Sequence, residues 1–329
     1  MKKATATAPS NIAFIKYWGR KDEKLRIPTN GSISMNLSNL LTTTTVAFDE
    51  SLEKDEIEMI KSEKRKAKSE KQQFETRIIE HLDRIRKLAG ITAYAKVISE
   101  NNFPSDTGLS SSASGFAALT LAAATAAGLK LTEKELSILA RQGSGSAARS
   151  IPDGFVEWFA GDSNESSYAV SIFPPEWFDI IDIVAIVSTE KKYIPTAKGH
   201  TFAQSSPLFE KRLENIDNKI SECKKFIQEQ NFEKFGELIE KEAIEMQSIM
   251  TSSTPPLSYL LPQSQQLLNQ IKQWRSDGLS IYFTFNTGQN IHVICRQKDT
   301  KKVSKLLKSL AYVLQIIENR PAIGARLLS

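Results

Sequence analysis

The sequence predicts an α+β protein with two domains, and three observations support this class. The length of 329 residues exceeds that of one typical domain. With 40% hydrophobic and 25% charged residues, the composition is that of a chain that buries a sizeable core. Strand-like and helix-like patterns alternate. After the proline pair at residues 174–175 the pattern changes to a continuous apolar run followed by long polar helices. We therefore expect a boundary near residue 178, between domains of residues 1–178 and 179–329.

The first domain is expected to contain short strands and two helices. β-branched residues gather in short runs, which is typical of strands. Between Phe74 and Leu88 the apolar residues recur at spacings of four and three, which predicts an amphipathic helix that ends near Gly90. An alanine-rich stretch closed by Gly128 predicts a helix at about residues 109–127. The strands are predicted at residues 3–8, 42–48, 93–98, 155–160 and 168–173.

The second domain begins with residues 180–187, a continuous apolar run that is consistent with a strand buried on both faces. A hairpin-like pair of strands at residues 279–285 and 291–295 brackets the loop 286–290. Helices are predicted at about residues 207–229, 232–250 and 262–276, and a last helix begins near residue 300.

The sequence lacks the features of membrane, disulfide-rich and metal-cluster proteins. No stretch approaches the roughly 18 to 20 continuous apolar residues that span a bilayer, and the first residues lack the apolar core of a signal peptide. Cys223 and Cys295 fit no metal or redox spacing. The histidines His81, His200 and His292 are too scattered to form a multi-histidine site with neighbours in sequence. We expect a soluble, cytoplasmic protein without a membrane partner.

The chain is only mildly basic, with a net charge of +5 from 43 basic and 38 acidic residues. Its densest basic run, at residues 61–71, resembles a nucleic-acid patch in composition. However, Glu63 and Glu70 interrupt the run, no aromatic residues are interleaved, and no recognisable nucleic-acid module surrounds it. A solvated helix start or loop is the favoured interpretation, and we expect no nucleic-acid partner.

The most informative segment is the glycine- and serine-rich stretch at residues 101–115, between a predicted strand and the alanine-rich helix. Gly108 permits a tight turn, and the serines at the helix start offer hydroxyls beside unpaired backbone N–H groups. Such a helix N-terminus attracts phosphate through its oriented donors and the helix dipole. The stretch is not a Walker pattern, because no Gly-Lys-Ser/Thr follows. From the residues alone, a phosphate-binding loop and a plain serine-rich helix cap are equally open.

Two further segments point to an anionic ligand. Ser144, Ser146 and Arg149 place two hydroxyls and a guanidinium within six residues of a glycine-containing backbone. The alternative for this segment is a flexible loop with a surface arginine. Lys16 is flanked by apolar and aromatic residues, so we expect it to be half-buried and to need an anionic partner. The alternative for Lys16 is a side chain that snorkels to the surface.

Taken together, these segments resemble the diphosphomevalonate decarboxylase family of the GHMP kinase superfamily, and the resemblance covers nearly the whole chain. It implies an N-terminal domain of ribosomal-protein-S5-like type, a ferredoxin-like C-terminal domain and an active site in the cleft between them. The matching signatures occur in the family's order at residues 11–19, 28–34, 101–115, 143–149, 154–158 and 324–327.

The resemblance implies a decarboxylation of mevalonate 5-diphosphate to isopentenyl diphosphate that depends on ATP and Mg²⁺. In the family reaction, ATP phosphorylates the 3-hydroxyl, and the new phosphate then leaves together with CO₂. This departure builds positive charge at C3, so the site must neutralise phosphate oxygens while it excludes water. A small-molecule substrate is the expected partner. The oligomeric state is open, with a homodimer as one option.

The family's functional residues are carried onto the matching positions of this sequence. Lys16 and Arg149 are expected to face the reacting groups, and Ser111 is the expected Mg²⁺ ligand. The residues expected to hold the substrate are Tyr17, Arg20, Ser144, Gly145, Ser146, Arg149 and Lys198. Those expected to hold ATP are Asn101, Pro104, Gly108, Leu109, Ser110, Ser111, Ser112 and Ser114.

The sequence departs from the family pattern at three places. Asn286 stands where the family has a catalytic aspartate, and an amide cannot act as a general base. We expect Asn286 to position the hydroxyl while the transferring phosphate takes its proton, with Asp153 as the alternative catalytic base. Arg20 replaces a lysine and keeps its charge. The loop at residues 194–200 lacks the arginine that often contacts the diphosphate, for which Lys198 or His200 would substitute.

These departures leave alternative functions open. A diphosphate normally needs an additional cation, so the missing arginine leaves a 5-phosphomevalonate decarboxylase that forms isopentenyl phosphate as one alternative. Because Asn286 replaces the family aspartate, a mevalonate 3-kinase and a non-catalytic relative are two further alternatives. Lys16 and Arg149 favour the decarboxylase, because a kinase that never eliminates phosphate has less need of both cations.

Overall fold

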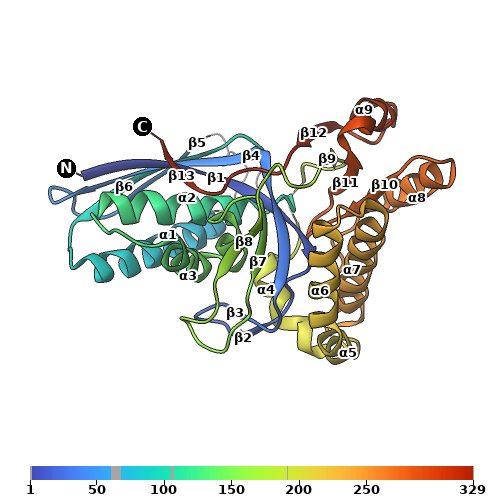
Figure 1. Cartoon of the computed structure of the whole chain (residues 1–329). Helices are drawn as coiled ribbons and strands as arrows, with labels where there is room; N and C mark the ends of the chain where they lie inside the picture. The colour runs from blue at the N-terminus through green and yellow to red at the C-terminus, as the bar shows by residue number, and fades with distance from the viewer. Residues whose placement is uncertain (1, 61–67, 105–106, 191, 329) are drawn as a thin grey trace.

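The computed structural model describes residues 2–60, 68–104, 107–190 and 192–328. Two layered units, each built around its own sheet, lie side by side (Figure 1). This arrangement confirms the predicted α+β class. Most of the basic run at residues 61–71 lies outside the described residues, because these do not include residues 61–67. The interpretation of this run therefore stays a prediction. None of the helices that the structure describes combines the length and the apolar character needed to cross a bilayer.

The first unit is built on a seven-stranded sheet with two long strands at its centre, β1 (Lys2–Ile15) and β4 (Ser32–Asp49). They pair antiparallel, from Lys2 opposite Phe48 to Ile15 opposite Ile33. Both exceed their predicted lengths, because the ladder continues through a register shift between Pro9 and Asn11. The other strands are β5 (Glu56–Ile60), β6 (Tyr94–Asn101), β7 (Phe155–Trp158), β8 (Ala169–Phe173) and β13 (Arg326–Leu328).

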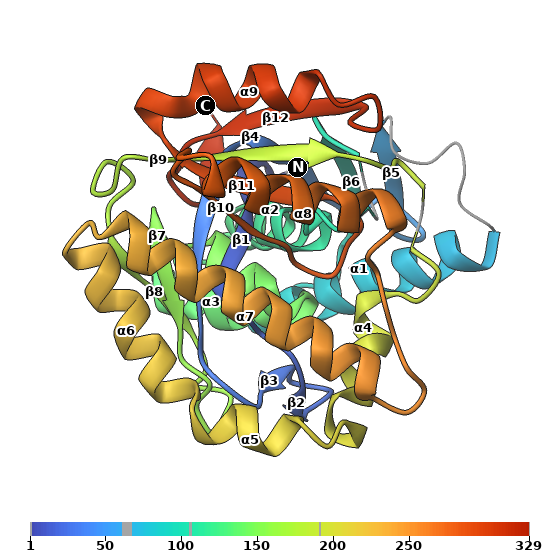
Figure 2. The same cartoon turned by 90° about the vertical axis from the view of Figure 1, so that its right-hand side faces the viewer.

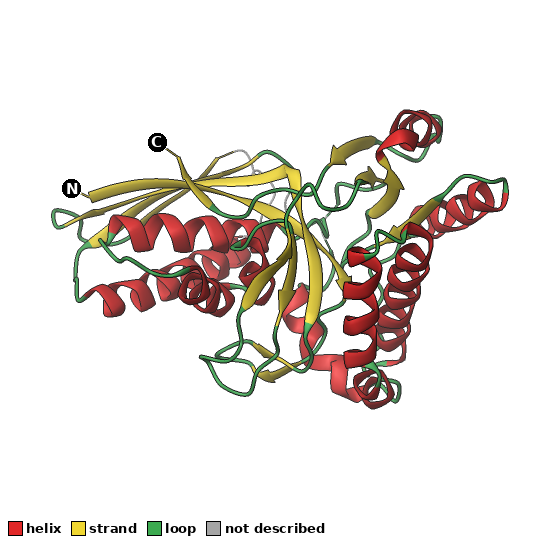
Figure 3. Cartoon of the chain, in the orientation of Figure 1, coloured by secondary structure: helices red, strands yellow, loops and turns green. Residues whose placement is uncertain are grey.

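Three helices cover one face of this sheet: α1 (Lys68–Ala89), α2 (Ser111–Ala126) and α3 (Glu133–Gly143) (Figures 1 and 3). Helix α2 lies against β1 and β4 and also contacts the other two helices, which is why it is rich in alanine on all sides. Helix α3 is not among the helices predicted from the sequence. A start signal was available, since Thr132 and Glu135 form a capping box at its N-terminus.

The second unit contains an antiparallel sheet in the order β10-β11-β9-β12. Strand β9 (Ile180–Ile186) is buried along its whole length, which confirms the prediction from its apolar run. Strands β10 (Ile281–Thr284) and β11 (Ile291–Arg296) form the predicted hairpin, and β12 (Gln315–Asn319) is an unpredicted strand. The helices are α4 (Thr196–Gly199), α5 (Phe209–Glu214), α6 (Ile216–Gln228), α7 (Phe232–Ser252), α8 (Pro262–Ser276) and α9 (Thr300–Lys308).

The structure differs from the predictions in several places. The helix predicted at residues 207–229 divides into α5 and α6, because Asn215 leaves the helical conformation and its N–H bonds to the carbonyl of Arg212. Strand β13 returns from the second unit to the first sheet, where Leu328 pairs with Thr5. The short strands β2 (Arg20–Asp22) and β3 (Ile27–Pro28) were beyond prediction, because so few residues carry no periodic pattern.

The two units share one hydrophobic core. Phe14 of β1 packs edge-on against Phe235 of α7, with ring centroids 4.8 Å apart. The same cluster includes Ile33 and Phe155 from the first sheet and Ile294 from the second. In Figure 2, α7 crosses in front of β1, and both α6 and α7 contact this strand. The residues that follow β1 are therefore placed against helices of the second unit.

The loop between β10 and β11 touches the glycine- and serine-rich loop of the first unit. Gly108 has a φ of +94°, and a Cβ atom at this position would lie 2.2 Å from the Cα atom of Gly288. The side chain of Asn290 donates a hydrogen bond of 3.1 Å to the carbonyl of Thr107. The two glycines thus allow the two backbones to meet, which side chains would prevent.

Replacing Gly108 by alanine is expected to lower the stability much more than the same change at Gly278. The two glycines have nearly equal φ values, +94° and +91°, so both variants carry the strain of a left-handed backbone, about 1–2 kcal/mol. Only at Gly108 would the new Cβ meet another backbone, whereas the space at Gly278 is open. Thermal unfolding should show a melting temperature several degrees lower for Gly108→Ala than for Gly278→Ala. Equal losses would show that the contact with Gly288 contributes nothing.

Candidate active site

A cavity of about 260 Å³ lies between the two units. Its wall is formed by the end of β1, the N-terminus of α2, the 3₁₀ helix η1 (Gly145–Ser150), the segment around α4, and the loop after β10. The three segments that the sequence analysis singled out, which are far apart along the chain, therefore meet at one place. This convergence favours the ligand-binding interpretation of each of them over its structural alternative.

Lys16 directly follows β1 and is buried, with 1% of its surface exposed. Its Nζ atom donates hydrogen bonds to the carbonyl of Ala13 at 2.5 Å and to Oγ1 of Thr284 at 2.7 Å. Burial lowers the pKa of Lys16 to about 7, and the nearby Arg149 also lowers it. The side chain is more deeply buried than predicted, and it does not snorkel to the surface.

Arg149 belongs to η1 and is also buried, which contradicts the alternative of a surface arginine on a flexible loop. Its Nη1 atom donates to Oγ of Ser32 at 2.8 Å, and Nη2 donates to Oδ1 of Asn11 at 3.1 Å. The Nε atom is buried and has no hydrogen-bond partner among the described residues. Burial lowers the pKa of Arg149 to about 10, so the guanidinium is still charged at neutral pH.

The residues expected to hold the substrate line the cavity, with one exception. The hydroxyl of Tyr17 accepts a hydrogen bond of 2.7 Å from Nε of Arg20. A Cβ atom on Gly145 would lie 2.7 Å from the same hydroxyl, so only glycine leaves room for the Tyr17 ring. Ser144 and Ser146 also line the cavity.

The exception is Lys198, which is exposed and does not line the cavity. The short helix α4 points Lys198 outward and places Thr196 and Ala197 on the cavity wall instead. The cation supplied from this part of the chain is Lys192, which the sequence analysis does not select. His200 lines the cavity, and its Nδ1 atom accepts a hydrogen bond of 3.1 Å from the N–H of Gly19. Burial and neighbouring cations hold the pKa of His200 well below its usual range, so the ring is neutral.

The N-terminus of α2 opens onto the cavity, as the sequence predicts. Gly108, Ser110, Ser111 and Ser112 line it, and the hydroxyls of Ser112 and Ser144 are 3.1 Å apart. Ser110 adopts the left-handed conformation with a φ of 56°, which turns the chain into the helix.

Four residues assigned to the nucleotide loop do not line this cavity. Leu109 is buried in the shared core, and Oγ of Ser114 lies 2.6 Å from Oγ1 of Thr42 on β4, so both shape the loop from behind. The carbonyl of Pro104 accepts a hydrogen bond of 3.2 Å from the hydroxyl of Thr107. Asn101 lines a smaller neighbouring cavity of about 80 Å³, which also borders Ser111 and Ser112.

The charged side chains on the described wall of the larger of these two cavities are all cationic. No carboxylate lines it among the residues that the structure describes. Arg26 and Arg77 belong to this wall but carry no local sequence signal, because only the fold brings them to it. The complete set of cations is Lys16, Arg20, Arg26, Arg77, Arg149 and Lys192. Such a wall is suited to a ligand with several negative charges.

Asn286 ties the two units together at the cavity. Its Oδ1 atom accepts from the N–H of Ala13 at 3.3 Å, while Nδ2 donates to the carbonyl of Asn11 at 3.2 Å and to Oγ of Ser110 at 2.9 Å. Both ends of the amide are thus used. An amide both donates and accepts hydrogen bonds, so an asparagine fits these three partners.

Asp153, the alternative base, is not brought to the cavity. Its side chain is exposed, and its carboxylate accepts a hydrogen bond of 2.6 Å from the N–H of Gly324. The physical reason is that η1 ends at Ser150, after which the chain turns toward the C-terminal segment. The structure therefore gives no support to Asp153 as a catalytic base.

The described residues contain no group of three histidine, cysteine, aspartate or glutamate side chains that could hold a metal ion by themselves. A hard cation such as Mg²⁺ accepts hydroxyl and phosphate oxygens with few protein ligands. The hydroxyls at the start of α2 offer such oxygens, and the cationic wall would bind the accompanying phosphates. The site therefore fits Mg²⁺ that arrives together with a phosphate ligand.

Known proteins resemble this chain over both units. Residues 8–169 match the family described as the diphosphomevalonate decarboxylase-like N-terminal domain, and residues 182–322 match the mevalonate 5-diphosphate decarboxylase C-terminal domain. The chain is 36% identical over 320 residues to the diphosphomevalonate decarboxylase of Candida albicans. This similarity covers 93% of the chain and 88% of that relative.

Solved structures are similar over the full length. The mevalonate diphosphate decarboxylase from Staphylococcus aureus has a TM-score of 0.90 at 36% identity, covering 100% of this chain and 98% of that one. A structure of the protein called MDDEF, in complex with MVAPP, AMPPCP and magnesium, has a TM-score of 0.91 at 32% identity, with 99% of each chain covered. These similarities confirm the fold that the family resemblance implies.

Proposed function

The chain belongs to the diphosphomevalonate decarboxylase family, and we propose that it converts mevalonate 5-diphosphate to isopentenyl diphosphate in an ATP-dependent decarboxylation. The observation that carries the proposal is the cavity between the two units. There, the N-terminus of α2 meets a wall of cations that includes the buried Lys16 and Arg149. A cytoplasmic location belongs to the same proposal, and the oligomeric state stays open, with a homodimer as one option.

The residues of the cavity fit ATP and Mg²⁺. The backbone N–H groups and hydroxyls at the start of α2 would hold phosphates, and Gly108 leaves room for their close approach. The smaller cavity, bordered by Phe74 and Asn101, is placed to take the flat adenine base beside them. The relative MDDEF was solved with AMPPCP, an ATP analogue, and magnesium, which supports this assignment. When bound, ATP and Mg²⁺ supply the phosphoryl group that makes the 3-hydroxyl a leaving group.

A diphosphate is the substrate that the cavity suits best. The missing arginine in the 194–200 loop is offset by Arg20, Arg26 and Lys192, which all line the cavity. The relatives are named as decarboxylases of mevalonate diphosphate, and MDDEF was solved with MVAPP. Neither a monophosphate substrate, nor a 3-kinase, nor a non-catalytic role is supported by these similarities.

Lys16 and Arg149 are proposed to stabilise the negative charge that develops on the departing phosphate. Both are buried, so their charges act in a medium of low dielectric constant from which water is largely excluded. The pKa of Lys16 is lowered to about 7 in the free protein. Anionic ligands beside it would raise this pKa, so we expect Lys16 to be a cation in the complex.

The proton of the substrate 3-hydroxyl needs an acceptor. Among the residues that the structure describes, no carboxylate lines the cavity, so this acceptor would be another group. Asn286 would position the reacting groups through its rigid ties to Ala13 and Ser110. We assign the proton to a phosphate oxygen of the co-substrate ATP, since a loose phosphoryl-transfer transition state asks little of a base.

The direct test of the function is to incubate the protein with ATP, Mg²⁺ and mevalonate 5-diphosphate and to measure ADP and CO₂ separately. We expect both products in equal amounts, and a much higher kcat/KM than with mevalonate 5-phosphate. ADP without CO₂ would instead identify a 3-kinase, and neither product would identify a non-catalytic relative. A preference for the monophosphate would overturn the substrate assignment alone.

Arg149→Lys is expected to reduce turnover nearly as strongly as Arg149→Ala, by about 10² or more. The guanidinium contacts Ser32 and Asn11 with two different nitrogens, and a lysine cannot reach both while it faces the cavity. Steady-state kinetics would measure the effect. The matched control is Arg275→Lys, which alters a partly buried arginine that is paired with Glu240 outside the cavity. This variant should change stability but not turnover. An Arg149→Lys enzyme with near-normal turnover would contradict the assignment.

Asn286→Asp is expected to preserve or raise turnover, whereas Asp153→Asn should have little effect. A carboxylate at position 286 would add a base in the cavity, and general-base catalysis commonly contributes about 10² to 10⁴-fold. Asp153 contacts Gly324 rather than the cavity, so its charge is not needed for the chemistry. Rates of CO₂ release would measure both effects. If Asp153→Asn abolished turnover while substrate still bound, Asp153 would be the base after all.

A further inference from the structure

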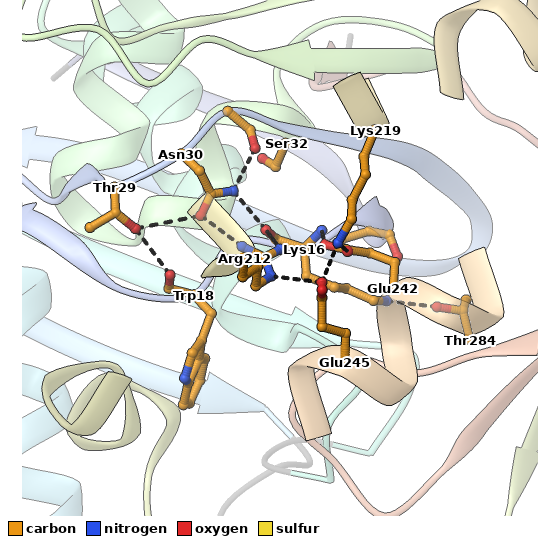
Figure 4. Close-up of polar contacts among 12 residues, drawn as sticks. Lys16, Trp18, Thr29, Asn30, Ser32, Arg212, Lys219, Glu242, Glu245 and Thr284 are labelled. Carbon is orange, nitrogen blue, oxygen red and sulfur yellow. Dashed lines mark hydrogen bonds and ion pairs between the residues drawn. The ribbon is translucent and has the colours of Figure 1, made fainter. Parts of the chain in front are cut away.

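A buried cluster of charges lies behind the cavity. It consists of Arg212 on α5, Lys219 on α6, and Glu242 and Glu245 on α7, and we call it the rear cluster (Figure 4). The side chains of Arg212 and Glu242 are fully buried and form an ion pair, while Lys219 bridges Glu242 and Glu245. None of these residues lines the cavity, so the cluster has no part in ligand contact.

The rear cluster holds the main chain of Lys16. Oε1 of Glu242 accepts a hydrogen bond of 3.0 Å from the N–H of Lys16, and Nη2 of Arg212 donates one of 2.9 Å to the carbonyl of Lys16. Asn30 donates a second bond, also of 2.9 Å, to this carbonyl. Lys16 comes directly after β1, where ladder pairing ends at Ile15. The cluster thus takes over the hydrogen bonds that the sheet no longer provides.

The Glu242 carboxylate, which is bonded to the main chain of Lys16, also influences the charge of the Lys16 side chain. Burial lowers the pKa of Lys16, and Glu242 is the strongest opposing influence. The other charges around Lys16 are Arg149 of η1 and Arg212 of α5, which lower its pKa, and Asp182 of β9, which raises it. Asp182 is bonded to His292 of β11, which lies opposite the Lys16 partner Thr284 in the sheet register. Lys219 of α6 forms an ion pair with Glu242.

The cavity itself offers Lys16 no negative charge among the described residues. Position 286, where the family resemblance places an aspartate, is an asparagine whose amide is already used in three hydrogen bonds. The anion that most strongly raises the pKa of Lys16, Glu242, therefore belongs to the second unit and lies outside the cavity lining. This arrangement keeps the cavity wall cationic while it still opposes loss of the proton from Lys16.

We propose that Glu242 is a positioning residue for the decarboxylation, which fixes the main chain of Lys16 and supplies, from behind the cavity, the negative charge that position 286 lacks. The inference rests on the proposed function, in which Lys16 acts as a cation. Glu242 touches neither the substrate nor ATP in this scheme. It acts only through Lys16.

The test is the pH dependence of kcat/KM in Glu242→Gln, which removes the charge but keeps a side-chain oxygen to accept from the N–H of Lys16. Without the carboxylate, the pKa of Lys16 falls further, so the ammonium loses its proton at lower pH. We expect the alkaline limb of the kcat/KM profile to move to lower pH by roughly one unit, because an opposite charge nearby shifts a pKa by about 1–3 units.

Glu240→Gln is the matched control. Glu240 lies on the same helix, is buried, pairs with an arginine and accepts a main-chain N–H, that of Phe283, at 3.1 Å. It does not contact Lys16, so its variant should lose stability without a shift of the alkaline limb. Equal shifts in Glu240→Gln and Glu242→Gln would overturn the proposal, as would an unchanged limb in a folded Glu242→Gln protein.

A second variant separates the charge effect from a loss of stability. Both changes break a buried ion pair and are expected to destabilise the protein, but their shifts of the alkaline limb should differ in sign. Lys219→Met removes a cation beside Glu242 and should move the alkaline limb in the opposite direction, to higher pH. A purely structural role would not produce shifts of opposite sign, and an unmoved limb in Lys219→Met would count against the proposal. Adding Asn286→Asp to Glu242→Gln should return the limb toward its original position.

The proposed function and the role of Glu242 can be contradicted separately. If the unaltered protein released no CO₂ from mevalonate 5-diphosphate, the proposed function would be wrong. If the unaltered protein were active and its profile were unaffected by Glu242→Gln, only the role of Glu242 would be wrong.

Discussion

The ammonium group of Lys16 lies in the protein interior, where an isolated charge is far less stable than in water. It is accommodated because acceptors from both units converge on it, the carbonyl of Ala13 from the first and the hydroxyl of Thr284 from the second. The rear cluster fixes the main chain of the same residue. The position of this one charge therefore depends on the correct docking of the two units, and the shared core around Phe14 and Phe235 provides that docking.

On the described cavity wall, cations lie near one another with no carboxylate among them. Cations line the described wall, whereas Glu242, whose carboxylate accepts a hydrogen bond from the main-chain N–H of Lys16, is not part of it. An anionic ligand consequently meets an attractive surface and relieves the repulsion among the cations. In the proposed function, the same charges would bind the ground state and stabilise a departing phosphate, but they would accelerate the reaction only to the extent that they hold the transition state more tightly. Rigid placement of Lys16 and Arg149 would favour binding of the transition state over binding of the ground state.

Much of the fold and the site could be predicted from the sequence, because many of the signals are local. The apolar run of β9, the alanine-rich α2 and the glycine turn before it each depend on residues close together in the chain. The convergence of the motifs at residues 11–20, 101–115 and 143–149 was predicted through the family resemblance, and the cavity confirms that they meet.

What could not be predicted depends on contacts between distant residues. Lys192 and Lys198 are equally plausible cations in the sequence, and only the orientation of α4 decides between them. Glu242 carries no local signal at all, since its partner Lys16 is 226 positions away. Asp153 follows Arg149 closely in sequence, yet the turn after η1 directs it elsewhere.

The shared core and the rear cluster together restrict how such a chain can be recombined. Phe14 and Lys16 belong to the first unit, while the groups that pack against or bind them, Phe235, Arg212 and Glu242, belong to the second. A chimera that joined the first unit of one relative to the second unit of another would break these pairs wherever the parents differ in them. Although each unit has its own sheet, the two halves of the chain are therefore not interchangeable modules, and substitutions on the two sides of the boundary must be compatible with each other.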